Sequence, residues 1–285
     1  MKILDTLIDD IYDTLSVLCD GGHLHITDEQ IDKFGEQMKE VIKQWARPEK
    51  RNQEFSLRLS NIGRPARLLW YEKRHNGDTE INPHTMIKFL YGHMLEEVAL
   101  LLAELAGHTV THRQHEVTVG GITGHMDSMI DGEVVDVKTA SNFSYRKFNY
   151  GTLLDDDPFG YLAQLAGYES AMGTTGGAFL VINKETGQLC LCMPEELEKP
   201  NIEGRIKAIK TLIDKDEPPA KCYNPVPEGV KGNMVLDKNC KYCSYKEECW
   251  KDANDGNGLR VFQYANEKKY FTTVVAEPKV QEVLE

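Results

Sequence analysis

The sequence lacks the features that mark membrane, secreted and disulfide-stabilised proteins. No uninterrupted apolar run approaches the ~20 residues that span a bilayer. The first 15 residues are acidic and amphipathic, whereas a signal peptide begins basic and then becomes apolar. With 285 residues, the chain can bury a core without a disulfide framework. We therefore expect a cytoplasmic protein with no membrane partner, in which clustered cysteines are metal ligands.

Positive charge is also scarce, because 33 Lys and Arg residues face 45 Asp and Glu residues and leave a net charge of −12. Such an excess of acid argues against a nucleic-acid partner, since the phosphate backbone attracts basic surfaces. The segment 47–74 departs from this balance, with eight basic residues, three acidic ones and a local charge of +5. It is either a solvated connector or a phosphate-binding surface, and in the second case Arg58, Arg64 and Arg67 are candidate DNA contacts.

Hydrophobic periodicity predicts helices and strands along most of the chain. Two helices are expected within residues 1–46, with Asp28 as the N-cap of the second, and an amphipathic helix over residues 84–106. Residues 116–140 alternate apolar and polar side chains between glycine-containing turns, which predicts three antiparallel strands joined by tight hairpins. The remaining expected elements are a helix at about 157–172, two strands on either side of residues 184–187, and a helix through residues 202–213.

This order of elements divides the chain into three expected segments. Residues 1–83 form a helical and basic region, residues 84–217 form a core, and residues 218–285 form a C-terminal segment. The last segment is rich in proline, glycine, cysteine and charge. We therefore expect it to be held together by something other than an apolar core.

The third predicted strand contains the spacing that is most informative about chemistry. Asp136 and Lys138 project from one face of this strand, because side chains alternate along it. Pairing about the turn at residues 131–132 would set Asp127 directly opposite Asp136. Neighbouring carboxylates repel each other, and Mg²⁺ or Mn²⁺, which prefer oxygen ligands, would remove that cost. Otherwise the strand face is solvated and the Asp–Lys pair has no function.

Polar residues on the neighbouring predicted elements add to this spacing. Glu96 follows Gly92 by one turn, and the missing side chain at Gly92 would let the helix approach the sheet closely. Gly124 lies three residues before Asp127. On the following helix, Gln164 and Tyr168 are four residues apart and share a face. Each of these features is weak alone, but their order along the chain is informative.

Taken in this order, the motifs resemble those of the PD-(D/E)xK nuclease superfamily, in particular its RecB-like branch, over about residues 60–193. The resemblance implies an α/β fold with a restriction-endonuclease-like αβββαβ core, in which helices flank a mixed central sheet. It implies that Lys138 orients or activates the attacking water, while His93 is only a minor candidate for the site. The residues that it implies as ligands of one or two Mg²⁺ or Mn²⁺ ions are Glu96, Asp127, Asp136 and the backbone carbonyl of Val137, with Gln164 and Tyr168 completing the site.

Four cysteines in the C-terminal segment have the spacing of metal ligands. They are Cys222, Cys240, Cys243 and Cys249. Four thiolates around a metal would supply folding energy, but cysteine alone does not distinguish zinc from an iron–sulfur cluster. The CxxCx5C pattern is similar to part of the iron–sulfur staple of RecB-like enzymes, which favours a 4Fe–4S cluster over structural Zn²⁺. In that family the first cysteine lies upstream, where this chain has Pro65. Cys222 is taken as its substitute, with Cys19 as the second candidate.

The predicted function is a Mg²⁺- or Mn²⁺-dependent DNA nuclease. We expect an exonuclease that acts at DNA ends or in single strands during recombination, repair or replication, either as a homo-oligomer or with a partner from those processes. Within the aromatic and basic run 141–150, Tyr145 would stack on bases while Arg146 and Lys147 meet phosphates, unless these side chains only fill a loop. The alternative is a non-catalytic DNA-binding or scaffolding subunit with a structural metal cluster.

Overall fold

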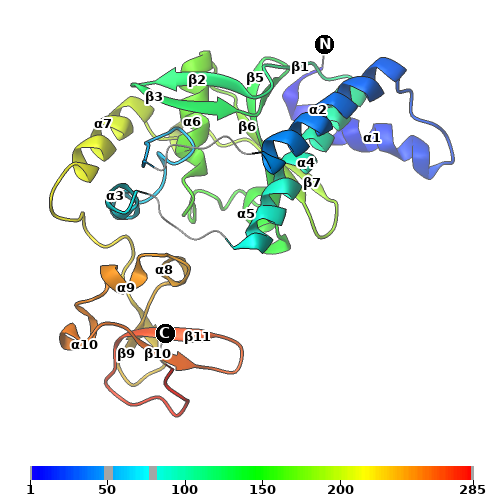
Figure 1. Ribbon diagram of the computed structural model, residues 1–285. Coiled ribbons are helices and arrows are strands. Elements are labelled where there is room, and N and C mark those ends of the chain that lie inside the picture. Colours follow the sequence, from blue (N-terminus) through cyan, green and yellow to red (C-terminus); the bar gives the residue numbers. More distant parts are fainter. Residues whose placement is uncertain (1, 48–53, 77–81, 284–285) are drawn as a thin grey trace. The chain divides into compact units, whose positions relative to one another are not determined.

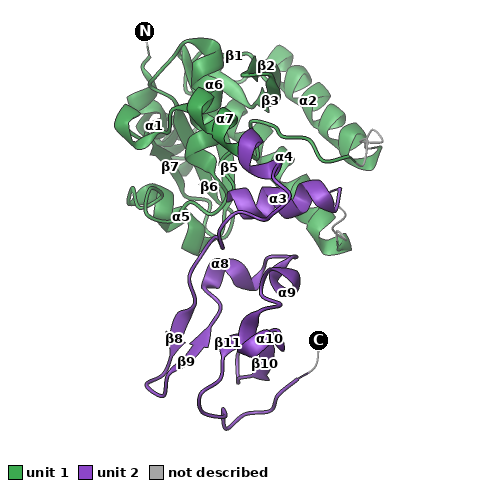
Figure 2. Cartoon of the chain, turned by 90° about the vertical axis from the view of Figure 1, so that its left-hand side faces the viewer, with its two compact units in different colours: residues 1–64, 80–209 green, residues 65–79, 210–285 purple. Residues whose placement is uncertain are grey.

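The computed structural model describes residues 2–47, 54–76 and 82–283. The chain divides into two compact units (Figure 2). Unit 1 comprises residues 1–64 and 80–209, and unit 2 comprises residues 65–79 and 210–285. These bounds differ from the three segments expected from the sequence. The N-terminal helices share a unit with the core strands, while the segment 65–79 joins the C-terminal residues.

Unit 1 contains most of the helices and strands labelled in Figure 1. Its helical elements are η1 (Leu4–Thr6), α1 (Leu7–Cys19), α2 (Asp28–Ala46), α4 (Pro83–Leu105), α5 (Asn142–Asn149), α6 (Tyr161–Met172), η2 (Glu196–Glu198) and α7 (Ile202–Ile213), whose last residues belong to unit 2. Its strands are β1 (Val110–Thr111), β2 (His115–Val119), β3 (Ile122–Met126), β4 (Ser128–Ile130), β5 (Glu133–Ala140), β6 (Ala178–Asn183) and β7 (Leu189–Cys192). Over the described ranges, the helices include none that is both long and apolar enough to cross a membrane.

The central sheet of unit 1 is mixed, with the strand order β1-β4-β5-β6-β7. Strands β5 and β6 are parallel, and the other neighbouring pairs are antiparallel. Helices α1 and α4 pack against Val135 and Val137 on one face of the sheet. Because side chains alternate along β5, Asp136 and Lys138 point to the opposite face, where α6 contacts the strand. The expected α/β fold, with a mixed central sheet flanked by helices, is thus confirmed.

The predicted three-strand meander has an additional break. Strands β2 and β3 pair only with each other, while β4 and β5 form a hairpin whose turn residues, Asp131 and Gly132, both have positive φ angles. The break falls at Asp127, which lies between β3 and β4 and not within a strand as expected. The register nevertheless pairs Ser128 with Val135, so the preceding residue lies across from Asp136 as predicted.

Three expectations about helices need correction. The N-cap of α2 is Thr27, not Asp28, because the Thr27 hydroxyl accepts the backbone N–H of Gln30 while the Gln30 side chain accepts that of Thr27. Residues 142–149 form the helix α5, not a loop. The next helix begins at Tyr161, not near residue 157, because the Asp157 carboxylate caps its first turn.

Unit 2 has its own sheet and its own small core. Its elements are α3 (Ala66–Arg74), β8 (Val226–Glu228), β9 (Asn233–Val235), α8 (Lys238–Lys241), α9 (Lys246–Cys249), α10 (Ala253–Gly256), β10 (Arg260–Gln263) and β11 (Lys268–Thr273). The strands form an antiparallel sheet in the order β10-β11-β9-β8. Leu236 and Trp250 lie in one apolar cluster, and Phe262 and Phe271 in another. The expectation that this segment lacks an apolar core was therefore wrong.

Candidate active site

Lys138 lies at the centre of the candidate site, near the end of β5. Its Nζ atom is 2.5 Å from Oδ2 of Asp136 and donates to Oε1 of Gln164 at 3.5 Å. The same ammonium group lies 4.8 Å from the ring centroid of Tyr161. One neighbour comes from β5 and two come from α6, so the packing of α6 on the sheet fixes the position of this lysine.

Asp136 is the most deeply buried carboxylate of the site, with 1% of its surface exposed. Among the residues that the structure describes, its Oδ1 atom has no hydrogen-bond partner. Burial raises the pKa of Asp136; the Lys138 ammonium opposes this rise and Glu96 adds to it. A buried carboxylate oxygen without a donor is costly, so this atom would be stabilised by a cation.

Asp127 and Glu96 bring two further carboxylates to the site. Oδ2 of Asp127 accepts the backbone N–H of Val137 at 2.7 Å, and Oε1 of Glu96 accepts from Nε2 of Gln114 at 2.5 Å. Burial raises the pKa of Asp127 well above its usual value, and the charges of Asp136 and Glu96 raise it further. The three carboxylates are therefore close enough to repel one another.

Lys138 supplies the compensating charge at this cluster. Burial acts to lower its pKa, but the carboxylates of Asp136 and Asp127 outweigh burial and raise the pKa above the usual value for lysine. The side chain is therefore an ammonium ion at neutral pH, able to donate hydrogen bonds and to stabilise negative charge. One lysine facing three carboxylates leaves the cluster short of positive charge.

Gln164 and Tyr168 extend this network from α6 to β3. Nε2 of Gln164 donates to the Tyr168 hydroxyl at 3.1 Å, and that hydroxyl donates to the backbone carbonyl of His125 at 2.8 Å. Burial raises the pKa of Tyr168, so the hydroxyl keeps its proton. The predicted sharing of one face by these two side chains is confirmed. Their hydrogen bonds link Lys138, through Gln164 and Tyr168, to the backbone of β3.

The two motif glycines differ in the space around them. A Cβ atom at Gly92 would meet only Oγ1 of Thr139, at 4.0 Å, so α4 does not need a glycine to approach the sheet there. At Gly124, in contrast, a Cβ atom would lie 2.7 Å from Cβ of Leu59 and 3.0 Å from Cε1 of Tyr168. The close approach expected at Gly92 was therefore wrong, and Gly124 is the position where close packing requires glycine.

The donor set at the site suits a hard cation without forming a complete binding site. Over the described ranges, no group of three or more His, Cys, Asp or Glu side chains is arranged to hold a metal ion. Asp127 and Glu96 each use one oxygen in a hydrogen bond within the protein. The unpartnered Oδ1 of Asp136 is the atom that fits a cation, because Mg²⁺ and Mn²⁺ prefer carboxylate oxygen ligands.

The four cysteines of unit 2 influence one another electrostatically. Burial raises the pKa of the Cys240 thiol to about 12, and the thiols of Cys222, Cys243 and Cys249 add to this rise. These thiols fit zinc or an iron–sulfur cluster in chemistry, although no metal-holding group of three is formed in the part of the chain that the structure describes. Cys190 lies instead in the buried strand β7.

Arg67 contacts this cysteine cluster from α3. Its Nε atom donates to Sγ of Cys249 at 3.1 Å, and its Nη1 atom donates to the carbonyl of Pro219 at 2.5 Å. The backbone N–H of Leu68 bonds the thiol of Cys222. Arg67 therefore contributes to the packing of unit 2, and its role as a DNA contact stays a prediction.

The other predicted DNA contacts differ in their accessibility. Tyr145 is buried, with 7% of its surface exposed, and its hydroxyl donates to the carbonyl of Leu189 at 2.9 Å. It cannot stack on a base, because its ring fills the core beneath α5. Lys147 pairs with Asp156 at 2.6 Å, whereas Arg146 is exposed.

The basic segment before α3 is described only in part. Arg58 is exposed and Arg64 is half-buried, and both lie in unit 1. Lys50 and Arg51 fall outside the described residues. Of the predicted DNA contacts, Arg58, Arg64, Arg67, Arg146 and Lys147 therefore stay predictions, whereas the burial of Tyr145 rules it out.

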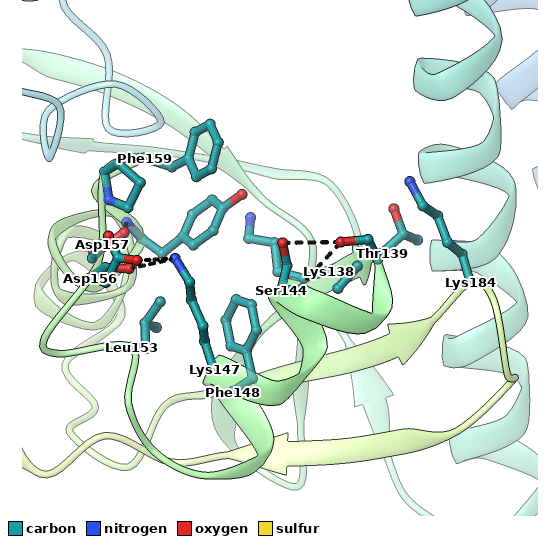
Figure 3. Close-up of a pocket in the computed structure, with 14 residues that line it drawn as sticks. Lys138, Thr139, Ser144, Lys147, Phe148, Leu153, Asp156, Asp157, Phe159 and Lys184 are labelled. Carbon is teal, nitrogen blue, oxygen red and sulfur yellow. Dashed lines mark hydrogen bonds and ion pairs between the residues drawn. The ribbon is translucent and has the colours of Figure 1, made fainter. Parts of the chain in front are cut away.

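Tyr161 is a site residue that the sequence interpretation missed. Its ring borders Lys138, and it also lines a cavity of about 210 Å³ beside that lysine. Figure 3 shows this cavity. The signal was its position, three residues before Gln164, because residues three apart on a helix lie on neighbouring parts of one face. Lys184, on the turn between β6 and β7, also lines this cavity and had no signal in the local sequence.

Comparison with known proteins gives matches only among solved structures. A scan against models of protein families finds no match to this chain, and a search of curated proteins finds none. The chain is similar to SSO0001, with 15% identity and a TM-score of 0.37 over 74% of this chain and 93% of that one. It is also similar to an alkaline exonuclease (LHK-Exo) from Laribacter hongkongensis, with 15% identity and a TM-score of 0.39 over 66% of this chain and 93% of that one. The structure of LHK-Exo in complex with dAMP matches with 16% identity and a TM-score of 0.34, over 55% and 92% of the two chains.

Proposed function

We propose that this chain is a Mg²⁺- or Mn²⁺-dependent DNA nuclease that removes nucleotides from DNA ends or single strands. The observation that carries the proposal is the buried carboxylate of Asp136, whose Oδ1 atom has no partner among the described residues although Lys138 lies beside it. Asp127 adds charge of the same sign. A structural ion pair would leave no such excess, whereas a cation-binding hydrolase needs it.

The carboxylates would hold one or two divalent cations. The ligands would be Asp136, Asp127, Glu96 and the carbonyl of Val137, all of which are oxygen donors of the kind that Mg²⁺ and Mn²⁺ prefer. When bound, such a cation supplies Lewis-acid polarisation of the phosphate and a more acidic water. The hydrogen bonds of Asp127 and Glu96 within the protein fix the orientation of these two carboxylates before any ligand arrives.

Lys138 would act on the reacting groups as an ammonium ion. Its raised pKa means that it donates protons in hydrogen bonds and does not serve as a general base at neutral pH. It would orient the attacking water or stabilise charge that develops on the phosphate. Gln164, whose amide oxygen accepts from Nζ, keeps the lysine in this position.

The cysteines of unit 2 would hold a structural metal group. We propose a 4Fe–4S cluster bound by Cys222, Cys240, Cys243 and Cys249, with zinc as the alternative for the same thiols. The mutual influence of the four thiols supports a common site. A purified protein that absorbs near ~400 nm would support iron–sulfur, whereas a colourless protein carrying stoichiometric zinc would contradict it.

Digestion of DNA with and without ends tests the proposed activity. With Mg²⁺ or Mn²⁺, we expect wild-type protein to degrade linear single-stranded DNA and to leave a covalently closed single-stranded circle intact. Lys138→Met should reduce the rate at least about 100-fold, because the charge that stabilises the reacting phosphate is lost. Lys39→Met, which removes an exposed ammonium group on α2, serves as the charge-matched control.

Each outcome of this assay has a distinct meaning. Degradation of the circle would identify an endonuclease and overturn the exonuclease part of the proposal. Digestion by Lys138→Met at the wild-type rate would remove this lysine from the mechanism. DNA binding without digestion under either metal would instead favour the non-catalytic subunit. Circular dichroism establishes that each variant is folded before its rate is compared.

A further inference from the structure

A cavity of about 210 Å³ opens beside Lys138, where β5 ends and α5 begins (Figure 3). Its walls also include the loop that precedes α6 and the turn between β6 and β7. Of the residues that line it, the proposed nuclease mechanism uses only Lys138. The lining residues that bear on its ligand are Ser141, Ser144, Lys147, Phe159, Tyr161 and Lys184.

An aromatic ring with a fixed orientation forms one side of this cavity. Phe159 is 56% exposed, and its ring stacks on that of Tyr161 with 5.5 Å between centroids and 24° between planes. Tyr161 in turn contacts the buried rings of Phe148 and Phe179, at 5.9 and 6.2 Å, which hold it in place. Phe159 therefore presents a preformed apolar face to solvent. It lies next to Lys138, because both residues contact the ring of Tyr161. Such a face is suited to stacking on a nucleobase.

The cationic groups around the cavity differ in how they are paired. Lys138 pairs with Asp136, and Lys147 pairs with Asp156. The Lys184 ammonium is exposed and has no ion pair or hydrogen bond with any described residue, while its backbone N–H is anchored to the carbonyl of Ala140 at the end of β5. The Lys184 ammonium is thus available to pair with an anionic ligand, while its backbone is held in place. In the view of Figure 3, Lys138 lies between Phe159 and Lys184.

Size and polarity limit what this cavity can take. Its volume is below the range of about 300–1,000 Å³ that is typical of pockets for drug-sized ligands, which favours a single nucleotide unit. Hydroxyl groups line it, and Oγ of Ser141 lies 3.4 Å from Oγ of Ser144. An aromatic face, hydroxyl donors and an unpaired ammonium together match the base, the sugar and the phosphate of a nucleotide.

We propose that this cavity binds the nucleotide next to the phosphodiester bond that is cleaved, with its base stacked on Phe159 and its phosphate near Lys184. The inference rests on the proposed nuclease function and assigns it a substrate subsite. The substrate class is single-stranded DNA, because stacked neighbours cover both faces of a base inside a duplex and leave none for Phe159.

Steady-state kinetics with a single-stranded oligodeoxynucleotide provides the first test. Phe159→Ala should raise KM about tenfold with little change in kcat, and Phe159→Trp should restore the wild-type KM, because a ring of either kind stacks on a base. Lys184→Ala should also raise KM and should make the slope of log affinity against log salt less negative by about 0.7. Tyr150→Ala and Lys39→Ala, exposed residues that do not line the cavity, are the matched controls.

An abasic substrate separates stacking from a general loss of stability. In wild-type protein, removing the base from the nucleotide at the digested end should raise KM about tenfold, as Phe159→Ala does on the intact substrate. In Phe159→Ala protein, the abasic change should have no further effect, because the contact is already absent. Full additivity of the two changes, or no effect of either, would overturn the assignment of Phe159 as the stacking residue.

A binding measurement decides the inference independently of hydrolysis. Oligodeoxynucleotides with 2-aminopurine at the terminal position are titrated with Asp136→Asn protein, and stacking is expected to quench their fluorescence. The double variant that carries both Asp136→Asn and Phe159→Ala should show no quenching. The double variant with Asp136→Asn and Tyr150→Ala should quench as Asp136→Asn alone does. Equal quenching with and without Phe159 would overturn the subsite. Failure of wild-type protein to digest DNA would overturn the nuclease proposal instead, and this binding result would still stand.

Discussion

At the scale of single residues, the candidate site is a place where the fold accepts an unfavourable arrangement. The charges of Asp136 and Glu96 raise the pKa of Asp127, while the Lys138 ammonium and the backbone N–H of Val137 oppose this rise. Residues chosen only for stability would not be arranged in this way, since replacing one buried carboxylate by an amide would relieve the repulsion. A cost in stability at these positions is therefore the expected mark of a cation-binding site.

Asp127→Asn should stabilise the metal-free protein at pH 8. The pKa of Asp127 in the folded state is raised above its usual value of 3.8. In the pH window between these two pKa values, the folded state keeps a proton that the unfolded state has lost. The wild-type free energy of unfolding therefore falls as pH rises through the window, whereas the amide does not titrate. In EDTA we expect the variant to gain about 1 kcal/mol at pH 8, with the difference shrinking toward pH 4.

Urea unfolding at both pH values measures this difference, and Mn²⁺ supplies its control. The cation should stabilise wild-type protein at pH 8 and stabilise the variant much less, because a ligand has been lost. A destabilised variant in EDTA at pH 8 would show that Asp127 is a structural carboxylate.

The two motif glycines give a matched pair of stability predictions. Gly124→Ala should lower the free energy of unfolding by about 1–3 kcal/mol, because its Cβ atom would lie 2.7 Å from Cβ of Leu59. Gly92→Ala has room and lies within α4, so it should be neutral or stabilise by up to about 1 kcal/mol. Denaturant unfolding of the two variants compares them directly. Equal losses at both positions would contradict this view of the packing.

At the scale of elements, the sequence predicted which side chains share a face of a strand or helix and which lie opposite each other across a hairpin. Asp136 and Lys138 share a strand face, and Asp127 lies across from Asp136, because strand period and the turn at residues 131–132 fix both relations. The pairing of Gln164 with Tyr168 likewise follows from helical spacing. These relations span only a few residues, so the sequence contains them.

Relations between distant elements were not predictable in the same way. Residues 142–149 form a helix whose Tyr145 ring is buried, and the Tyr145 hydroxyl donates to the carbonyl of Leu189, a contact too distant in sequence for a local pattern to report. Arg67 is 182 residues from its partner Cys249, and no local pattern reports such a contact. The space at Gly92 and the stacking of Phe159 on Tyr161 also depend on the tertiary packing.

The contact between α3 and the cysteine segment gives the prediction at this scale. Arg67→Ala should destabilise unit 2 by about 1–3 kcal/mol and lower its metal content, because the hydrogen bonds to Cys249 and Pro219 are lost together. Arg67→Lys should not rescue it, since an ammonium group does not reproduce two donors in a planar fork. Metal analysis and absorbance near ~400 nm measure the content.

Lys73→Ala is the control for this change, because Lys73 lies on the same helix and its ammonium group forms an exposed ion pair with Asp214. It should leave stability and metal content unchanged. Full metal content in Arg67→Ala would show that the contact from α3 does not contribute to metal binding by the cysteines.

At the scale of the whole molecule, the net charge of −12 has a more limited meaning than its size suggests. Part of it is the carboxylate cluster, whose charge a bound cation would offset. The exposed Arg58, Arg146 and Lys184 leave positive charge on unit 1, where DNA would be bound. Binding to single strands should therefore weaken steeply with salt and strengthen with the divalent cation.

Two units with separate apolar clusters should not unfold as one. We expect two transitions in heat or denaturant, because small units with their own cores unfold cooperatively by themselves. Removing the thiol-bound metal should lower only the transition of unit 2. Calorimetry of the protein before and after chelation measures both transitions, and an equal shift of both would show that the units are energetically coupled.

The most direct test of the central claim compares wild-type protein and Asp136→Asn on end-labelled single-stranded DNA at pH 8. We predict that wild-type protein releases labelled nucleotides with Mn²⁺ and none with EDTA. The folded variant should be at least about 100-fold slower, because it lacks the carboxylate that would bind the cation through its unpartnered Oδ1 atom. Equal rates for the two proteins, or no release by folded wild-type protein with either Mg²⁺ or Mn²⁺, would contradict the account.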